Sequence, residues 1–355
     1  MKRLIKELCA IPGVSGFEQD IRSHIAQLIQ PYIDDMRTDA VGNLIAFKKG
    51  AQRGEETETA RALQNVRGGL LIAAHMDEVG FIVKKIDDKG YIRFAPIGGI
   101  DRRTILGGKV LIGKQKIPGA IGLRAYHLVS AKEEKNVPDV ADLYIDIGAS
   151  DKQQAEALIS IGDEIVYDSD FADFGQGMIK SKALDDRIGC AAMIQLIKKD
   201  LPCDCTFVFT AQEETGARGA FGAAFSIQPD IALILEGTTA ADVPPLKGHR
   251  QVTRAGEGPV LGVMDRGTIY DRNLFKRLRR LAEQNSIPWQ TKRTIAGGTD
   301  AQAVQTAAGG TRIAAISVPV RYIHTASSVA AISDCEHMVA LAEAFIASVA
   351  YESEE

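Results

Sequence analysis

Histidines and acidic residues of this chain stand directly after apolar runs, where buried strands would end. The apolar run 69–74 leads into His75-Met76-Asp77. On an extended chain, residues two apart point to the same side, so the side chains of His75 and Asp77 would lie on the same face of the strand. One side chain could then bind a metal ion while the carboxylate orients the imidazole. Taken alone, a His-x-Asp pair is more typical of a structural histidine.

Paired acidic residues recur further along the chain. Asp185 and Asp186 open an expected helix, where capping is the more common role for a carboxylate. Glu213 and Glu214 stand between a strand expected over 205–210 and a glycine-rich turn. Because adjacent side chains diverge, one glutamate could reach a metal ion while the other faces a substrate.

Two further runs end in the same way. The run 231–235 leads into Glu236 and a glycine turn, and a largely apolar run from 316 to 323 leads into His324. Together the runs place two imidazoles and at least three carboxylates at similar ends of successive strands. Such nitrogen and oxygen ligands suit zinc, cobalt or manganese. A carboxylate shared by two ions about 3.5–4 Å apart is typical of two-metal aminopeptidases.

These residues must be positioned by a sheet. Buried apolar runs alternate with helical segments such as 187–199 and 273–284, which predicts an α/β fold with a mixed, partly parallel sheet flanked by helices on both faces. Ligands on such sheets bind beyond the carboxyl ends of the strands. We expect a closing helix capped by Asp334.

The middle of the chain has a different pattern. From about residue 79 to 171, short β-like runs are separated by turns such as Asp88-Lys89-Gly90. We therefore expect a small all-β domain, 79–171, inserted into a catalytic domain formed by 1–78 and 172–355. The polar segment 50–67 is expected to be an exposed loop.

Composition narrows the class of protein. The chain has 355 residues and a formal net charge of −4, which argues against a nucleic-acid partner. Charged residues interrupt the apolar start, and no stretch approaches the roughly 20 apolar residues of a membrane helix. The five cysteines are read as reduced, buried thiols, and for the Cys203-x-Cys205 pair packing is favoured over metal binding. We expect a cytoplasmic protein.

Five segments occur in order along nearly the whole chain: His75-Met76-Asp77-Glu78-Val79-Gly80, Ala183-Leu184-Asp185-Asp186-Arg187, Glu213-Glu214-x-Gly216-x-x-Gly219, Gly297-Gly298-Thr299-Asp300-Ala301 and Arg321-Tyr322-Ile323-His324. They resemble the tetrahedral aminopeptidase and glutamyl aminopeptidase family of co-catalytic dinuclear metallopeptidases. The resemblance implies two divalent metal ions per subunit, zinc first and cobalt or manganese as alternatives. Their ligands would be His75, Asp185, Glu214, Glu236 and His324.

The resemblance also implies individual roles. Asp185 would bridge the ions, His75 and Glu236 would complete one site, and Glu214 and His324 the other. Many members carry aspartate at the position of Glu236. A cis peptide bond is expected between Asp185 and Asp186.

The remaining roles concern catalysis and assembly. Asp77 would steady His75, and Glu213 would be the general base that removes a proton from a bridging water. The inserted domain would be PDZ-like and take part in a homo-oligomer, built from dimers and reaching a dodecamer. The function implied is removal of N-terminal residues from peptides.

Two other functions remain open from the sequence. A metal-independent glycan hydrolase needs two carboxylates on either side of a sugar bond, which Glu213 and Glu214 could imitate, but His75 and His324 would then have no use. A non-catalytic assembly protein on the same scaffold is the second alternative. Sensitivity to a chelator separates the first from a metallopeptidase, and metal content separates the second.

Overall fold

The computed structural model describes residues 1–51, 69–130 and 133–352 of the chain. The polar loop expected over 50–67 therefore lies, except for its first two residues, outside the described residues.

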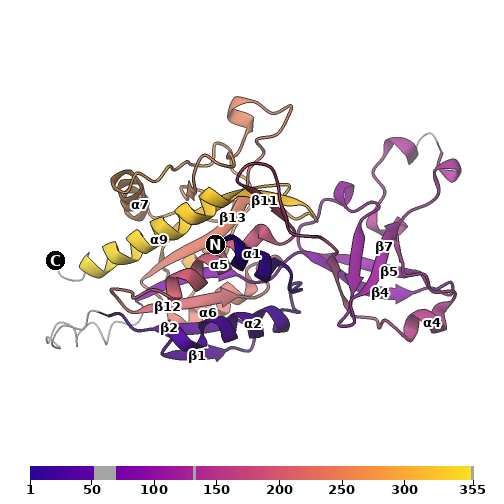
Figure 1. Cartoon of the computed structure of the whole chain (residues 1–355), viewed down its shortest axis with the longest axis horizontal. Helices are drawn as coiled ribbons and strands as arrows, with labels where there is room; N and C mark the ends of the chain where they lie inside the picture. Colours follow the sequence, from indigo (N-terminus) through magenta and orange to yellow (C-terminus); the bar gives the residue numbers. More distant parts are fainter. Residues whose placement is uncertain (52–68, 131–132, 353–355) are drawn as a thin grey trace.

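A ten-stranded mixed sheet forms the body of the protein (Figure 1). Its centre consists of four parallel strands in the order β12 (Cys205–Thr210), β3 (Leu70–His75), β13 (Ile231–Thr239) and β15 (Arg312–Arg321). Antiparallel strands extend it on one side, β2 (Leu44–Lys48) and β1 (Asp35–Thr38), and on the other, β16 (Ser328–Ala331), β11 (Met178–Ser181) and β10 (Ala172–Asp173). A short strand, β14 (Val260–Leu261), pairs with β15. The expected mixed α/β architecture is confirmed.

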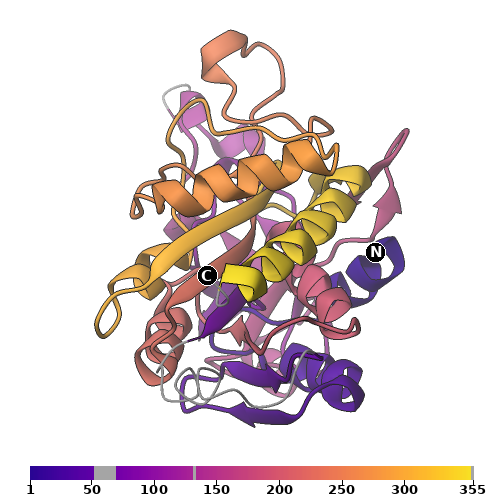
Figure 2. The same ribbon diagram turned by 90° about the vertical axis from the view of Figure 1, so that its left-hand side faces the viewer.

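Helices cover both faces of this sheet, as the buried parallel strands require. One face packs against α1 (Lys2–Cys9), α2 (Gln19–Ile29), α5 (Leu184–Ile197), α7 (Arg272–Gln284) and α9 (Ile332–Glu352). The other packs against α6 (Arg218–Ile227) and α8 (Ala301–Thr306). Figure 2 shows α7 and α9 lying over the same face of the sheet.

Alternate residues of the central strands supply the two apolar cores. In β12, Phe207 and Phe209 belong to the larger core, whereas Val208 between them belongs to the core under α6 and α8. This is the two-residue alternation of a β-strand whose two faces are both buried. Because the central strands are packed against helices on both faces, the positions of their carboxyl ends are well defined.

A separate β-sheet closes on itself beside this body, at the right of Figure 1. Its strands are β4 (Gly80–Ile86), β5 (Ile92–Ile97), β6 (Lys109–Ile112), β7 (Ile117–Gly122), β8 (Tyr144–Asp146) and β9 (Glu164–Tyr167), joined in the order β4-β5-β8-β7-β6-β9. A short helix, α4 (Lys152–Glu156), lies among them in the chain. Phe81 anchors the barrel's own core through edge-on contacts with Phe94 and Tyr167, at ring distances of 5.1 and 5.5 Å. The small β-sheet is confirmed, while its likeness to a PDZ domain stays a prediction.

The closing helix differs from the expectation. α9 begins at Ile332, so Asp334 lies inside its first turn and does not precede it. The Asp334 carboxylate instead accepts hydrogen bonds from the backbone of Gly256, at 2.7 Å, and Gly258, at 2.9 Å. The side chain of Asp334, which was expected to cap the helix, thus makes a tertiary contact that the local sequence pattern does not indicate. Within the described ranges, none of the helices combines the length and the apolar character needed to cross a membrane.

Candidate metal centre

The predicted ligands meet at the carboxyl edge of the four parallel strands. His75 is the last residue of β3, Glu213 and Glu214 follow the end of β12, and His324 follows the end of β15. Glu236 is different, because β13 continues to Thr239 and Glu236 therefore lies within the strand. Parallel strands bring these positions to one edge although they are far apart in sequence.

Asp185 stands between the two histidines. Its Oδ1 lies 3.3 Å from Nε2 of His75, and its Oδ2 lies 3.3 Å from Nε2 of His324. Each imidazole nitrogen has a second carboxylate close by. Glu236 Oε1 is 3.0 Å from the His75 nitrogen, and Glu214 Oε1 is 3.1 Å from the His324 nitrogen. The five side chains thus form two groups of three that share Asp185.

The chain reaches this geometry through an irregular start to α5. The Asp185–Asp186 peptide bond is cis, as the resemblance implied, and both residues have non-helical backbone angles. Asp186 accepts a hydrogen bond from the backbone of Gly189 at 2.9 Å. Asp186 therefore caps the helix, as expected for an acidic pair at a helix start, and leaves Asp185 free to face the histidines. Gly237 gives it room, since a methyl group there would lie 2.8 Å from Asp185 Oδ1.

Asp77 connects His75 to the loop that follows β12. Its Oδ1 lies 3.4 Å from Nδ1 of His75, on the side of the ring opposite Asp185. Its two oxygens also accept the backbone N–H groups of Glu213 and Glu214, at 3.0 and 3.2 Å. The hydroxyl of Ser15 donates to Asp77 at 2.6 Å. One fully buried carboxylate therefore fixes an imidazole and the backbone of both glutamates.

The small barrel contributes to the site as well. The backbone carbonyl of Gly99, in the loop after β5, lies 2.8 Å from Nδ1 of His324. This contact fixes the orientation of the ring and leaves Nε2 facing Asp185 and Glu214. In the same loop, Gly98 has φ +84°, and a methyl group there would lie 3.2 Å from Cβ of Glu214.

The charges of the cluster call for a cation. Burial opposes protonation of His324, but Asp185 and Glu214 outweigh it and raise its pKa to about 11. Burial likewise opposes a charge on His75, yet Glu236 and its other carboxylate neighbours raise its pKa. Burial raises the pKa of Glu236 well above its usual value. The two imidazoles and the Glu236 carboxyl group thus tend to hold protons, and a bound cation would supply the positive charge that these protons supply.

The donor set fits divalent metal ions. The nitrogen-to-oxygen separations of 3.0–3.3 Å match the spacing of about 3.3 Å between two ligands that each lie about 2.0–2.1 Å from a tetrahedral zinc ion. Oε2 of Glu236 is buried and has no hydrogen-bond partner among the described residues, so it is available to an ion. None of the potential ligand groups among the described residues includes a cysteine, and Cys203 and Cys205 are free thiols.

Glu213 lies beside these groups without belonging to the shared arrangement around Asp185. Its carboxylate falls within 4.8 Å of ligand atoms of His75 and Glu214. Burial raises the pKa of Glu213 well above the usual value, and the nearby carboxylates of Glu236 and Asp300 add to the rise. A carboxyl group with a raised pKa is suited to carry a proton near neutral pH.

Three contributors were not foreseen. Ser15 lies in the segment before α2, and nothing in the local sequence marks it as a partner of Asp77. The contact of Gly99 is made by its backbone carbonyl, so no side-chain type in the sequence could indicate it. Asp300 was part of a recognised segment but had no role. It is fully buried and accepts a hydrogen bond from Thr210, and its Oδ1 has no partner in the part of the chain that the structure describes.

Comparison with known proteins gives a consistent result. The family model "M42 glutamyl aminopeptidase" matches residues 59–341. A putative aminopeptidase of Acetivibrio thermocellus is 39% identical over 95% of this chain and 96% of its own, and a lysyl aminopeptidase of Pyrococcus furiosus is 31% identical over 97% and 96%. The TET1 peptidase of Pyrococcus horikoshii, which can assemble into a tetrahedron or a large octahedral shell, superimposes with a TM-score of 0.83 at 33% identity, covering 96% of this chain and 98% of that one. The chain therefore belongs to the M42 glutamyl aminopeptidase family and is an aminopeptidase.

Proposed function

We propose that the chain is a dinuclear metal-dependent aminopeptidase that removes N-terminal residues from peptides. His75 and Glu236 would hold one ion, Glu214 and His324 the other, and Asp185 both. The observation that carries this proposal is Asp185, each of whose oxygens lies 3.3 Å from a different histidine nitrogen. A carboxylate whose role was to stabilise a single imidazole would need only one such contact.

The bound ions would supply Lewis-acid chemistry, which polarises a peptide carbonyl and lowers the pKa of a water molecule towards about 7. Glu213 acts as the general base, taking a proton at its carboxylate and passing it to the leaving amine. The Asp77 carboxylate accepts the backbone N–H of Glu213 at 3.0 Å, which fixes the backbone position from which the Glu213 side chain extends. Asp77 orients His75 and holds the backbone of Glu213, and it therefore acts on the reaction only through other residues. The acidic surroundings favour the positively charged α-amine of a peptide, which accounts for exopeptidase action.

Residues 1–78 and 172–355 would form the catalytic domain, and residues 79–171 the domain for assembly into a homo-oligomer. Large apolar side chains of the barrel support an interface there, since Tyr126, Leu128 and Ile161 are 77%, 61% and 67% exposed. Exposed apolar groups of this size are typical of protein–protein contacts. The shells formed by the Pyrococcus horikoshii relative favour the same interpretation.

A glycan hydrolase explains the site less well. Its two carboxylates would act without metal ions, and the contacts of His75 and His324 with four carboxylate oxygens would serve no purpose. A non-catalytic protein would retain the ions but release no product.

The test uses metal-stripped protein restored with zinc, cobalt or manganese and assayed on a panel of aminoacyl-p-nitroanilides. We expect hydrolysis only after an ion is restored. Glu213→Gln should retain bound metal and lose about 10²–10⁴-fold in kcat. Glu257→Gln, at an exposed glutamate, is the matched control and should keep full activity. Full activity in Glu213→Gln would remove the general base from the proposal, and hydrolysis that survives stripping would remove the ions.

A further inference from the structure

The four residues that follow β12 form the glutamate segment (211–214), and each of their backbone N–H groups is bound by a side chain from elsewhere in the chain. The first N–H donates to Oδ1 of Asn43 at 2.9 Å, and the second donates to Oε1 of Glu18 at 3.1 Å. The last two donate to the carboxylate of Asp77. Three side chains from three other segments therefore fix the backbone that carries both glutamates.

Most carbonyl groups of the glutamate segment are bound as well. The carbonyl of Ala211 accepts the N–H of Gly219 at 3.0 Å, and that of Glu213 accepts the N–H of Gly216 at 2.8 Å. Gly219 permits this close approach, because a methyl group there would collide with Oδ1 of Asn43. Backbone groups that are bound in this way give the segment one preferred conformation.

Gln212 has a strained backbone conformation within the glutamate segment. Its φ is +58°, in the left-handed region that residues with a side chain rarely adopt. Such a conformation persists only where the surroundings hold it. The carboxylate of Glu18 holds the N–H of Gln212. Without this contact Gln212 can turn to a negative φ, which would redirect the chain that leads to Glu213.

Glu18 is placed for this contact and not for the helix that it precedes. It is the residue before α2, yet its side chain makes no capping hydrogen bond to that helix, whose residues are all described. Only 2% of Glu18 is exposed. Its Oε1 accepts the N–H of Gly16 at 2.7 Å as well as that of Gln212. One buried oxygen thus joins the start of α2 to the glutamate segment.

The glutamate segment carries a ligand of only one of the two candidate ion sites. Glu214 faces His324 from this segment, whereas His75 and Glu236 lie in strands β3 and β13. Loss of the Glu18 contact would therefore displace one ligand and the general base, and would leave the other pair of ligands in place.

We propose that Glu18 is a positioning residue for the reaction. Its Oε1 fixes the backbone of Gln212 and thereby the directions of the Glu213 and Glu214 side chains. The place of the oxygen, and not the charge of the carboxylate, carries the effect. This inference rests on the proposed function, in which one glutamate moves a proton and the other binds an ion.

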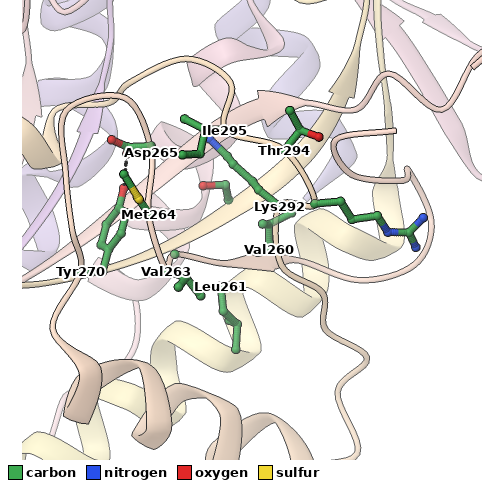
Figure 3. Close-up of a pocket in the computed structure, with 12 residues that line it drawn as sticks. Val260, Leu261, Val263, Met264, Asp265, Tyr270, Lys292, Thr294 and Ile295 are labelled. Atoms are coloured by element: carbon green, nitrogen blue, oxygen red, sulfur yellow. Dashed lines mark hydrogen bonds between the residues drawn. The ribbon is translucent and has the colours of Figure 1, made fainter. Parts of the chain in front are cut away.

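A cavity of about 130 Å³ lies beside the metal ligands and is separate from this network (Figure 3). Ser317, which is paired in register with Glu236 of β13, lines it, and the other lining residues lie within 260–270 and 292–295. Neither Glu18 nor the glutamate segment forms part of its wall. A change at Glu18 should therefore leave this surface intact, so we expect the loss in kcat and not in KM.

Two conservative variants separate the place of the acceptor from its charge. Glu18→Gln keeps an oxygen that can accept both N–H groups and removes the charge, whereas Glu18→Asp keeps the charge and draws the oxygen back by one methylene group. Glu18→Asp should lower kcat about 10–100-fold and change KM less than about threefold, because small misplacements of reacting groups have effects of this size. Glu18→Gln should keep kcat within about threefold of the wild type, because the acceptor stays in place. Both are measured on the aminoacyl p-nitroanilide that the wild type cleaves fastest.

Metal binding gives a readout that does not depend on turnover. Cobalt(II) is titrated into metal-stripped protein and followed by its visible absorption, and the wild type should take up two ions. Glu18→Asp should bind one ion about 10–100-fold more weakly and the other within about threefold, because the support of one ligand is displaced. Asp334→Asn is the matched control, since Asp334 is also buried and accepts the backbone N–H groups of Gly256 and Gly258. It should lower the urea midpoint and change neither kcat nor the two affinities.

The outcomes separate the two proposals. If wild-type protein binds no cobalt and cleaves no anilide with any ion, the proposed function itself fails. If the wild type is active, full activity in Glu18→Asp, an equal loss in Glu18→Gln, or equal weakening of both ions would overturn the role of Glu18. A Glu18→Asp variant that does not fold would show a role in the stability of the whole protein and would also overturn the inference.

Discussion

Replacing Asp77 by asparagine changes one buried oxygen into an NH₂ group and leaves the shape of the side chain intact. Asp77 is fully buried, and its two oxygens accept the backbone N–H groups of Glu213 and Glu214. Oδ1 also lies close to Nδ1 of His75, and Oδ2 accepts the hydroxyl of Ser15. Whichever way the new amide turns, its NH₂ group faces a backbone N–H.

The size of the effect follows from these contacts. One backbone hydrogen bond to a charged acceptor is lost, worth about 1.5–3 kcal/mol, and a buried donor is left unsatisfied. The Ser15 hydroxyl can reverse and accept, which recovers part of the loss. We therefore expect Asp77→Asn to lower the free energy of unfolding by about 2–4 kcal/mol. Because the imidazole loses its anionic partner, metal affinity should fall about 10–100-fold.

Urea denaturation of the metal-free protein measures the first effect, and a competition titration with zinc measures the second. Asp271→Asn is the matched control, since Asp271 also accepts two backbone N–H groups, at the start of α7, away from the metal ligands. That variant should lose stability but keep its metal affinity. If Asp77→Asn bound zinc as tightly as the wild type, Asp77 would not be the residue that orients His75.

Two further predictions concern other contacts around the site. Gly98→Ala should destabilise the protein by about 1–3 kcal/mol and reduce kcat/KM, because a methyl group at φ +84° would lie 2.8 Å from Val79 and 3.2 Å from Glu214. Gly175→Ala is the control, since Gly175 has φ +68° and no described residue lies within 4 Å of the added methyl group; it should show the backbone cost without the loss of activity. Equal activity in both variants would contradict the role given to the loop after β5. Arg321 donates to Asp242 at 2.7 and 2.6 Å and, against the effect of burial, holds the pKa of that carboxyl below its usual value. The ionised pair therefore stabilises the protein above about pH 4 and its contribution is lost as the pH falls through the lower folded value. In Asp242→Asn the free energy of unfolding should fall less steeply than in the wild type as the pH drops below 4. Urea denaturation at several pH values measures this slope. An unchanged slope would show that the pair does not stabilise the protein in this way.

The local sequence pattern was sufficient to predict the buried central strands. The apolar run before His75 predicted a buried strand, and β3 is buried along its whole length. The acidic pair at Asp185 was compatible with both capping and metal binding. In the structure Asp186 accepts the hydrogen bond from Gly189, while Asp185 faces His75. Periodicity cannot distinguish adjacent carboxylates, because a single peptide bond decides which way each one points.

Contacts between distant segments were beyond the reach of the sequence. The strand that carries Glu236 was expected to end there, yet pairing with β15 extends it to Thr239. Asp334 looked like a helix cap and instead holds the turn at Gly256. The Gly99 carbonyl and the Ser15 hydroxyl complete the site from other elements of the fold. Backbone carbonyls and single hydroxyls have no pattern of their own until the chain is folded.

The number of metal ions per chain tests the central claim most directly. Protein loaded with zinc, dialysed against metal-free buffer and analysed by mass spectrometry should retain close to two ions per chain. Asp185→Ala, which removes the carboxylate shared by both histidines, should retain one ion or none while still folding. Wild-type protein that retains no zinc, or an Asp185→Ala variant that still retains two ions, would contradict the account.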